Sequence, residues 1–268
     1  NQKTIETITN YISKEDAIKL VNKVESLTNG NVTVTNTGVV SSGKSSLFNA
    51  LLGKKDDERF SVGAARTTVL KDVEKYSDNI ELVDTPGIDV KEEDDVAALN
   101  AVCASSIILM VHNIKMGMLH KNEVDWIKKI SSNFETKEEL KDRFIFVNSW
   151  IDERIGDQSY QNTIDETKRM LFETLGVDVD FYSVSAKFYK KGISDDKDKF
   201  VEMSNILELK KAILDKSEIY LKKYGVNAIR KEISKLCVND KEKLNKVINE
   251  KNNCKKDIEN KIKDKYDV

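Results

Sequence analysis

Apolar residues near the start of the chain recur at steps of three and four, and this spacing predicts a helix over residues 2–28. The first apolar positions of this pattern are isoleucines: Ile5, Ile8 and Ile12. Ser13 offers a cap within this stretch, and Asp16 three residues later completes a pattern that resembles a capping box. The first part of the chain is therefore predicted to be helical, with a break at Ser13.

Beyond residue 30 the pattern changes to short apolar runs separated by helix-like spacing. The runs that predict strands begin at Val32 and continue at residues 68–76, 80–83, 107–111, 144–147 and 181–184. Helices are predicted at residues 44–52, 123–130, 160–175 and 206–221. This alternation predicts an α/β fold, a mostly parallel sheet with helices on both faces. The runs at 68–76 and 80–83 are close enough to form an antiparallel hairpin at the sheet edge.

The composition changes again after Gly225, where a thin apolar stripe runs among many lysines and acids. Such a stripe is too narrow for a separate stable domain. We expect it to pack on the N-terminal helices, and a solvated tail is the alternative. The predicted parts are N-terminal helices over 1–29, a domain over 30–222 and a helical segment over 223–268. Because the sequence starts at Asn1 rather than at methionine, we interpret it as a fragment.

The charge balance and the cysteine content exclude some classes of protein. The 44 Lys and Arg residues nearly balance the 46 Asp and Glu residues, so a mainly electrostatic nucleic-acid binder is not expected and no DNA partner is predicted. The three cysteines, Cys103, Cys237 and Cys254, are scattered and indicate reduced thiols. No apolar run approaches the ~18 residues of a membrane span. These features favour a cytoplasmic protein.

A phosphate-binding motif stands at residues 38–45, which fit G-x-x-x-x-G-K-[ST] between a predicted strand and a predicted helix. Gly38 and Gly43 allow the backbone to curl so that its N–H groups point at phosphate oxygens. Lys44 supplies a positive charge to the β- and γ-phosphates, and the Ser45 hydroxyl is a ligand for Mg²⁺. A glycine-rich turn that matches by chance is the alternative.

A second motif, Asp84-Thr85-Pro86-Gly87, ends the predicted strand at 80–83. A carboxylate at a strand end, here Asp84, can hold Mg²⁺ directly or through water. Gly87 can present its N–H to the γ-phosphate, and Pro86, the only proline in the chain, fixes φ before it. An ordinary β-turn is the alternative, although the P-loop upstream favours the phosphate site.

Together these two motifs resemble the GTPase superfamily of translation-factor and dynamin-related type. The resemblance implies a Ras-like P-loop GTPase domain that binds GTP or GDP with Mg²⁺. It also implies a switch threonine before the edge strand, for which Thr68 is favoured and Thr67 is the alternative. The implied metal ligands are Ser45, Thr68 and Asp84.

The base-reading motif of this family is [NT]-K-x-D, and here it departs from the pattern. The sequence Asn148-Ser149-Trp150-Ile151-Asp152 follows a buried strand. Either Ser149 replaces Asn/Thr and Trp150 replaces Lys, or Asn148 is the family asparagine and one residue is inserted. In both cases Asp152 could accept hydrogen bonds from guanine N1 and N2, and Trp150 could stack on the base. Because the motif departs from the family pattern at Ser149 and Trp150, an ATPase is the alternative to a GTPase.

A third family element is the S-A-K loop, whose backbone contacts the guanine oxygen. Ser185, Ala186 and Lys187 match it directly after the strand predicted at 181–184. Three residues are a weak match alone, but they stand where the order of the family motifs requires them.

The type of GTPase is indicated by Ile88, which follows Gly87. Ras-like enzymes carry glutamine at this position to orient the attacking water. A hydrophobic residue there resembles dynamin-related proteins and several ribosome-assembly GTPases. For dynamin-related proteins the resemblance implies that two GTPase domains pair across the nucleotide, and this pairing accommodates a monovalent cation.

The P-loop itself closely resembles that of dynamin. The similar residues are Ser41, Ser42, Gly43, Lys44, Ser45 and Ser46. The resemblance implies that all six bind nucleotide and that Ser41, Lys44 and Thr68 serve catalysis. Val40 stands where dynamin has a glutamine that positions water, and valine cannot make the hydrogen bond that this role requires.

The flanking helical sequence resembles the helical bundle and stalk attached to a dynamin-like GTPase domain. The first hypothesis is therefore a bacterial dynamin-like GTPase, activated by homodimerisation and coupled to stalk movement. A peripheral place on a membrane and a second dynamin-like subunit belong to this hypothesis. The alternatives are a ribosome- or RNA-associated GTPase that acts as a timer, and a nucleotide-gated interaction protein with weak catalysis.

Overall fold

The structure is a computed structural model of the 268-residue chain. It describes residues 5–7, 9, 13–28, 30–53, 60, 72–85, 88 and 92–225, and the single positions 234, 245, 249, 252, 253 and 256. The chain divides into two compact units, one of Asn1–Asn29 with Tyr224–Val268 and one of Gly30–Lys223. No helix in the described ranges is long and apolar enough to cross a membrane.

The first unit contains helix α2, Lys14–Thr28. Its start confirms Ser13 as a cap, because the Asp16 N–H donates to Ser13 Oγ at 3.1 Å. The Asp16 carboxylate accepts from the Ser13 hydroxyl at 2.7 Å rather than from its backbone N–H, so the pattern forms half of a capping box. Ala17 and Val21 are buried on one face of the helix. Ile8, Ile12 and the C-terminal apolar stripe lie outside the described residues, so the predicted packing between the two ends stays a prediction.

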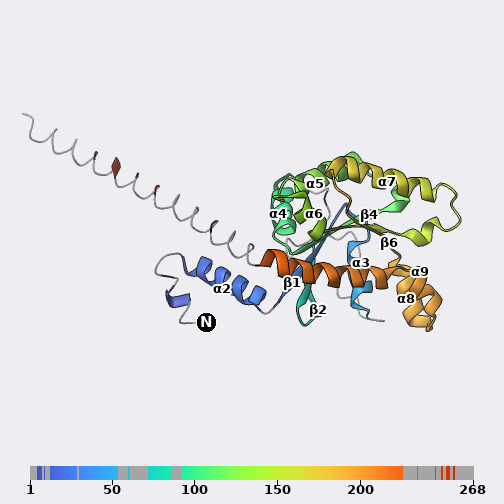
Figure 1. The fold of residues 1–268 in the computed structure, drawn as a ribbon, viewed down its shortest axis with the longest axis horizontal. Coiled ribbons are helices and arrows are strands. Elements are labelled where there is room, and N and C mark those ends of the chain that lie inside the picture. The colour runs from blue at the N-terminus through green and yellow to red at the C-terminus, as the bar shows by residue number, and fades with distance from the viewer. Residues whose placement is uncertain are drawn as a thin grey trace, which may run out of the picture. The chain divides into compact units, whose positions relative to one another are not determined.

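The second unit is built on a six-stranded sheet with the order β2-β3-β1-β4-β5-β6 (Figure 1). The strands are β1 Val32–Thr37, β2 Asp72–Ser77, β3 Ile80–Asp84, β4 Ile107–Asn113, β5 Phe144–Ser149 and β6 Asp180–Ser183. All neighbours are parallel except β2, which pairs antiparallel with β3 at the edge. The predicted mostly parallel sheet and its edge hairpin are therefore confirmed, although residues 68–71 lie outside the described part.

Helices connect these strands. They are α3 Lys44–Leu52, α4 Glu92–Cys103, α5 Lys121–Ser131, α6 Lys137–Arg143, α7 Tyr160–Leu175, α8 Ala186–Asp195 and α9 Asp198–Met203, followed by a helix over 206–225. Two short 3₁₀ helices, η1 Ile114–Met116 and η2 Ile151–Arg154, follow β4 and β5. The predicted helices at 44–52, 123–130, 160–175 and 206–221 are confirmed, whereas α4, α6, α8 and α9 were not predicted.

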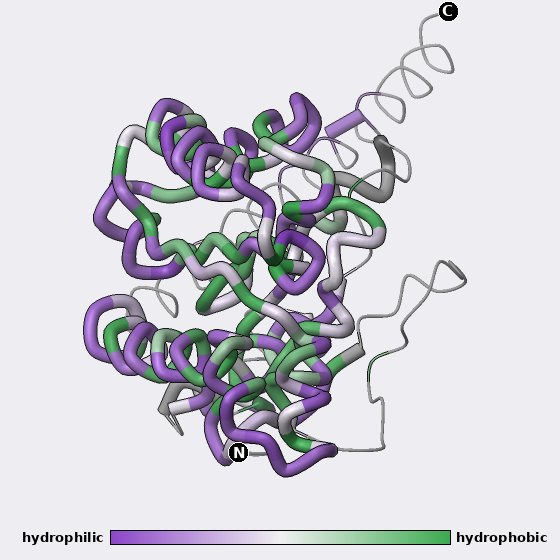
Figure 2. Tube along the Cα trace, turned by 90° about the vertical axis from the view of Figure 1, so that its right-hand side faces the viewer, coloured by the Kyte–Doolittle hydropathy of each residue, from purple (hydrophilic) through white to green (hydrophobic). Residues whose placement is uncertain are grey.

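The core lies on both faces of the sheet. On one face, buried residues of β4 and β5 pack with α4, α5, α6 and α7, and Trp126 and Ile127 of α5 are among them. On the other face α3 contacts α8 and β3. Figure 2 shows hydrophobic residues along the inner segments and hydrophilic ones on the outer helix turns. Covering both faces explains why β4 and β5 begin with continuous apolar runs.

A substitution in the central strand tests this core. Leu109 of β4 is 0% exposed, so Leu109→Ala should lower the free energy of unfolding by about 2–5 kcal/mol through lost burial and a cavity. Urea unfolding at 25 °C measures this change. The matched control is Leu207→Ala at a position 48% exposed, which should cost less than about 0.5 kcal/mol. Equal effects of the two substitutions would contradict the described core.

Candidate nucleotide-binding site

The loop between β1 and α3 is tightly curled, and two glycines make the curl possible. Gly38 has φ 143°, and a Cβ at this position would lie 2.1 Å from the Val111 carbonyl oxygen on β4. Gly43 has φ 94° and forms the N-cap of α3. Between them Ser41 is exposed and also left-handed, and its carbonyl accepts from Asn113 Nδ2 at 3.3 Å. The loop is therefore held against the end of β4.

The lysine of the loop lies inside this curl. Lys44 is 7% exposed, and its ammonium donates to the carbonyls of Gly38 at 3.0 Å and Val39 at 2.8 Å. This position places a positive charge beside the N-terminus of α3, where backbone N–H groups and the helix dipole favour an anion. Lysine and helix end together can therefore hold phosphate groups.

The two predicted magnesium ligands on described residues lie in contact. Ser45 Oγ donates to Asp84 Oδ2 at 2.6 Å, although the two residues come from α3 and β3. The end of β3 is fixed because Thr85 donates through its N–H to Asn36 Oδ1 and through its hydroxyl to the Asn36 carbonyl.

A neutral hydroxyl and a carboxylate are oxygen donors of the kind that Mg²⁺ prefers. The chemistry of this donor pair therefore fits the predicted ion. The remaining candidates of the phosphate site, Thr67, Thr68 and Gly87, lie outside the described residues.

Ser149 connects the base side of the site to the P-loop. Its hydroxyl lies 2.5 Å from the Ser42 carbonyl oxygen and 2.9 Å from that of His112, and either oxygen can accept its single proton. Asn148, in contrast, is 0% exposed within β5 and does not line the pocket described below. Both alignments of the family motif, with Asn148 or with Ser149 at its first position, therefore stay predictions.

The carboxylate of Asp152 is held in place by the loop after β6. Ser185 Oγ donates to Asp152 Oδ1 at 2.6 Å and accepts from the Phe188 N–H at 3.0 Å. Lys187 Nζ lies 3.4 Å from Asp152 Oδ2 and 3.3 Å from Glu153 Oε1. These hydrogen bonds, first to Glu153 and then to Asp152, raise the pKa of Lys187. The side chain of Asp152 is only 3% exposed, so its orientation is well defined.

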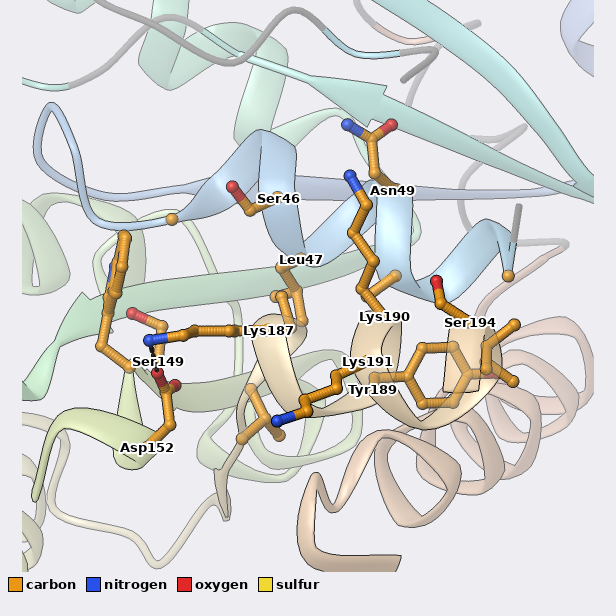
Figure 3. Close-up of a pocket in the computed structure, with 17 residues that line it drawn as sticks. Ser46, Leu47, Asn49, Ser149, Asp152, Lys187, Tyr189, Lys190, Lys191 and Ser194 are labelled. Carbon is orange, nitrogen blue, oxygen red and sulfur yellow. Dashed lines mark ion pairs between the residues drawn. The ribbon is translucent and has the colours of Figure 1, made fainter. Parts of the chain in front are cut away.

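A pocket of about 460 Å³ brings these residues together between α3, α8 and the end of β5. The predicted site residues that line it are Gly43, Ser46, Ser149, Trp150, Asp152, Ala186 and Lys187. The pocket continues along α8, where Figure 3 shows Lys190 directed toward Asn49 and Tyr189 farther along. Sequence analysis missed these last residues because no motif marks them.

Ile88 has its backbone rather than its side chain at the site. Its N–H donates to the Gly38 carbonyl at 3.1 Å, and its side chain is 8% exposed within the core on the α5 face. The structure therefore has no polar side chain at the position where Ras-like enzymes orient water.

Comparison with known proteins agrees with this geometry. Residues 33–149 match the family described as 50S ribosome-binding GTPase. No curated protein matches the chain. Together with the fold and the P-loop, this match over part of the chain is consistent with a Ras-like P-loop GTPase domain.

Two solved structures of bacterial dynamins share the fold. One, described as an oligomerised bacterial dynamin pair that provides a mechanism for long-range sensing and tethering of membranes, has a TM-score of 0.57 at 17% identity and covers 97% of this chain and 49% of that one. The other, LeoA bacterial dynamin GTPase from ETEC, has a TM-score of 0.54 at 18% identity. It covers 87% of this chain and 43% of its own. The chain thus spans about half the length of these structures.

The contact between Ser45 and Asp84 predicts how metal dependence responds to mutation. Ser45→Ala removes one oxygen donor, so the gain in GDP affinity on adding Mg²⁺ should fall on the order of tenfold. Titration with a fluorescent GDP analogue, in Mg²⁺ and in EDTA, measures this gain. Ser194→Ala, at the far end of the same pocket, is the control. An unchanged Mg²⁺ response in Ser45→Ala would contradict the assignment.

Proposed function

We propose that the chain is a dynamin-like GTPase that hydrolyses GTP with Mg²⁺, pairs with a second copy through its GTPase domain and moves its flanking helices at a membrane surface. GTP binding is supported by two groups of residues at the same edge of the sheet. Lys44 and the Ser45–Asp84 pair would bind the phosphates and Mg²⁺. The Asp152–Ser185 pair would bind the base.

Hydrolysis follows from the charges at the phosphate end. Phosphoryl transfer needs positioning and electrostatic stabilisation more than covalent chemistry. The Lys44 ammonium and the α3 N-terminus stabilise negative charge on the β- and γ-phosphates, and Mg²⁺ bound between Ser45 and Asp84 would neutralise more of it. The apolar Ile88 side chain cannot orient the attacking water, so another group must do so.

Pairing of two copies would supply the group that positions the attacking water. Ile88, the dynamin-like P-loop and the flanking helices motivate this part of the proposal, and the fold shared with bacterial dynamins supports it. One of those structures is described as an oligomerised pair that tethers membranes, from which we propose self-association, a second dynamin-like subunit and a peripheral membrane location. A monovalent cation at the paired site belongs to the same proposal.

The rate of GTP hydrolysis tests this function. Turnover per molecule should rise as protein concentration is increased about a hundredfold, because pairing activates hydrolysis. Lys44→Ala should lower turnover at least about 100-fold through lost charge stabilisation, whereas Lys128→Ala on the exposed side of α5 should not.

Two outcomes would overturn parts of this proposal. A flat specific activity, with a monomer in GDP and metal fluoride, would exclude activation by pairing. Turnover that is negligible in the wild type would favour the nucleotide-gated interaction protein instead.

A ribosome-associated timer is the second candidate, and the description of the matched family favours it. Co-sedimentation distinguishes the two. Binding to liposomes in the presence of a GTP analogue supports the first proposal, and binding to ribosomes supports the second.

A further inference from the structure

Asn36 is a fully buried polar residue near the carboxyl end of the central strand β1. The register of β1 with β3 ends at the pair Thr35 and Val83. The next positions along the two strands are Asn36 and Asp84. Because side chains alternate along a strand, residues opposite each other in a sheet point to the same face. Asn36 therefore stands beside the predicted metal ligand Asp84.

The side chain of Asn36 takes the place of its own carbonyl in the ladder between these strands. A parallel ladder repeats every two residues, and the Val32 N–H starts this one by donating to the Asn79 carbonyl at 2.7 Å. The repeat predicts a bond from the Thr85 N–H to the Asn36 carbonyl. Instead the Thr85 N–H donates to Asn36 Oδ1 at 3.1 Å, and the Thr85 hydroxyl donates to the Asn36 carbonyl at 2.7 Å. The regular ladder therefore ends at Asp84.

The amide nitrogen of Asn36 is a buried donor that has no hydrogen-bond partner among the described residues. The orientation of the amide is fixed, because the Thr85 N–H needs an acceptor and must face Oδ1 rather than Nδ2. Buried polar groups are almost always paired, and an unpaired one lowers stability. An apolar residue would avoid this cost and let the ladder continue. Folding alone therefore does not explain an asparagine here.

The groups around this amide belong to the predicted metal site. Asp84 accepts from Ser45 Oγ at 2.6 Å on the face of the sheet that α3 covers. The chain that follows Asp84 is tied to β1 again, because the Ile88 N–H donates to the Gly38 carbonyl at 3.1 Å. Carboxylates that bind metal ions are themselves hydrogen-bonded, and these outer partners orient them. Asn36 is placed to be such a partner.

We propose that Asn36 is a positioning residue for Mg²⁺ binding, whose amide oxygen fixes the end of β3 and whose amide nitrogen donates to the oxygen ligands of the ion. The inference rests on the proposed function, because it requires Mg²⁺ at Ser45 and Asp84. Asn36 acts through Asp84 rather than on the nucleotide. Its unpaired donor lowers the stability of the fold, and the orientation of the metal ligands is what this cost secures.

Nucleotide affinity with and without the metal tests this role. Asn36→Leu keeps the branched shape of the side chain and removes both polar atoms. The gain in GDP affinity on adding Mg²⁺ should therefore fall roughly 10- to 100-fold, whereas the affinity in EDTA should stay that of the wild type. Titration with a fluorescent GDP analogue in Mg²⁺ and in EDTA measures both constants without hydrolysis.

Thr35→Val is the matched control. Thr35 and Asn36 are both 0% exposed on β1, but the Thr35 hydroxyl bonds to that of Ser105 on the opposite face of the sheet. Thr35→Val thus removes a buried hydrogen bond of the same strand, and its response to Mg²⁺ should equal that of the wild type.

A second variant keeps the test decisive if urea unfolding shows that Asn36→Leu is not folded. Thr85→Val removes the hydroxyl bond to the Asn36 carbonyl and should lower the Mg²⁺ gain in the same direction. Combining Asn36→Leu with Ser45→Ala should cost less than the product of the two single effects, because both act on one ion.

The outcomes separate the inference from the function beneath it. If GDP binding by the wild type does not respond to Mg²⁺, the metal site of the proposed function fails and the inference fails with it. If the wild type responds and folded Asn36→Leu responds equally, the positioning role is wrong although the proposed function stands. The same holds for an equal response of Thr85→Val where Asn36→Leu does not fold. Equal losses for Asn36→Leu in EDTA and in Mg²⁺ would show a structural role only and overturn the inference.

Discussion

The site depends on the close approach of the P-loop to the ends of β4 and β5. Gly38 lies so near the Val111 carbonyl that a single Cβ would meet it at 2.1 Å, and the Ser149 hydroxyl joins the Ser42 carbonyl to that of His112. These contacts fix the loop from both strands. Because α3 starts where the loop ends, its N-terminus and Lys44 are fixed with it.

The parallel sheet then brings the remaining groups to the same edge. Asp84 ends β3, Asp152 follows β5 and Ser185 follows β6, and ligands of open α/β sheets bind outside the carboxyl ends of the strands. The strand order separates the proposed ligand groups. β3, which neighbours β1, ends in Asp84, a proposed metal ligand, whereas β5 and β6 lie across β4 and are followed by Asp152 and Ser185, which are proposed to contact the base.

Local patterns were sufficient to predict most of this arrangement. The apolar runs identified the strands, and the spacing of Gly38, Gly43 and Lys44 identified the loop, because both are properties of neighbouring residues. Short or weakly patterned helices such as the seven-residue α6 and six-residue α9 escaped prediction. The contact of Ser149 with the Ser42 carbonyl could not be predicted either, since it joins residues 107 positions apart.

The most direct measurement of the guanine site is competition between GTP and ATP for the wild-type protein. A carboxylate placed to accept from guanine N1 and N2 is left unpaired by adenine, and such sites reject the wrong ligand strongly. ATP should therefore bind at least about 100-fold more weakly than GTP. Equal or tighter binding of ATP would contradict the role of Asp152 and with it the assignment of this pocket to a guanine nucleotide.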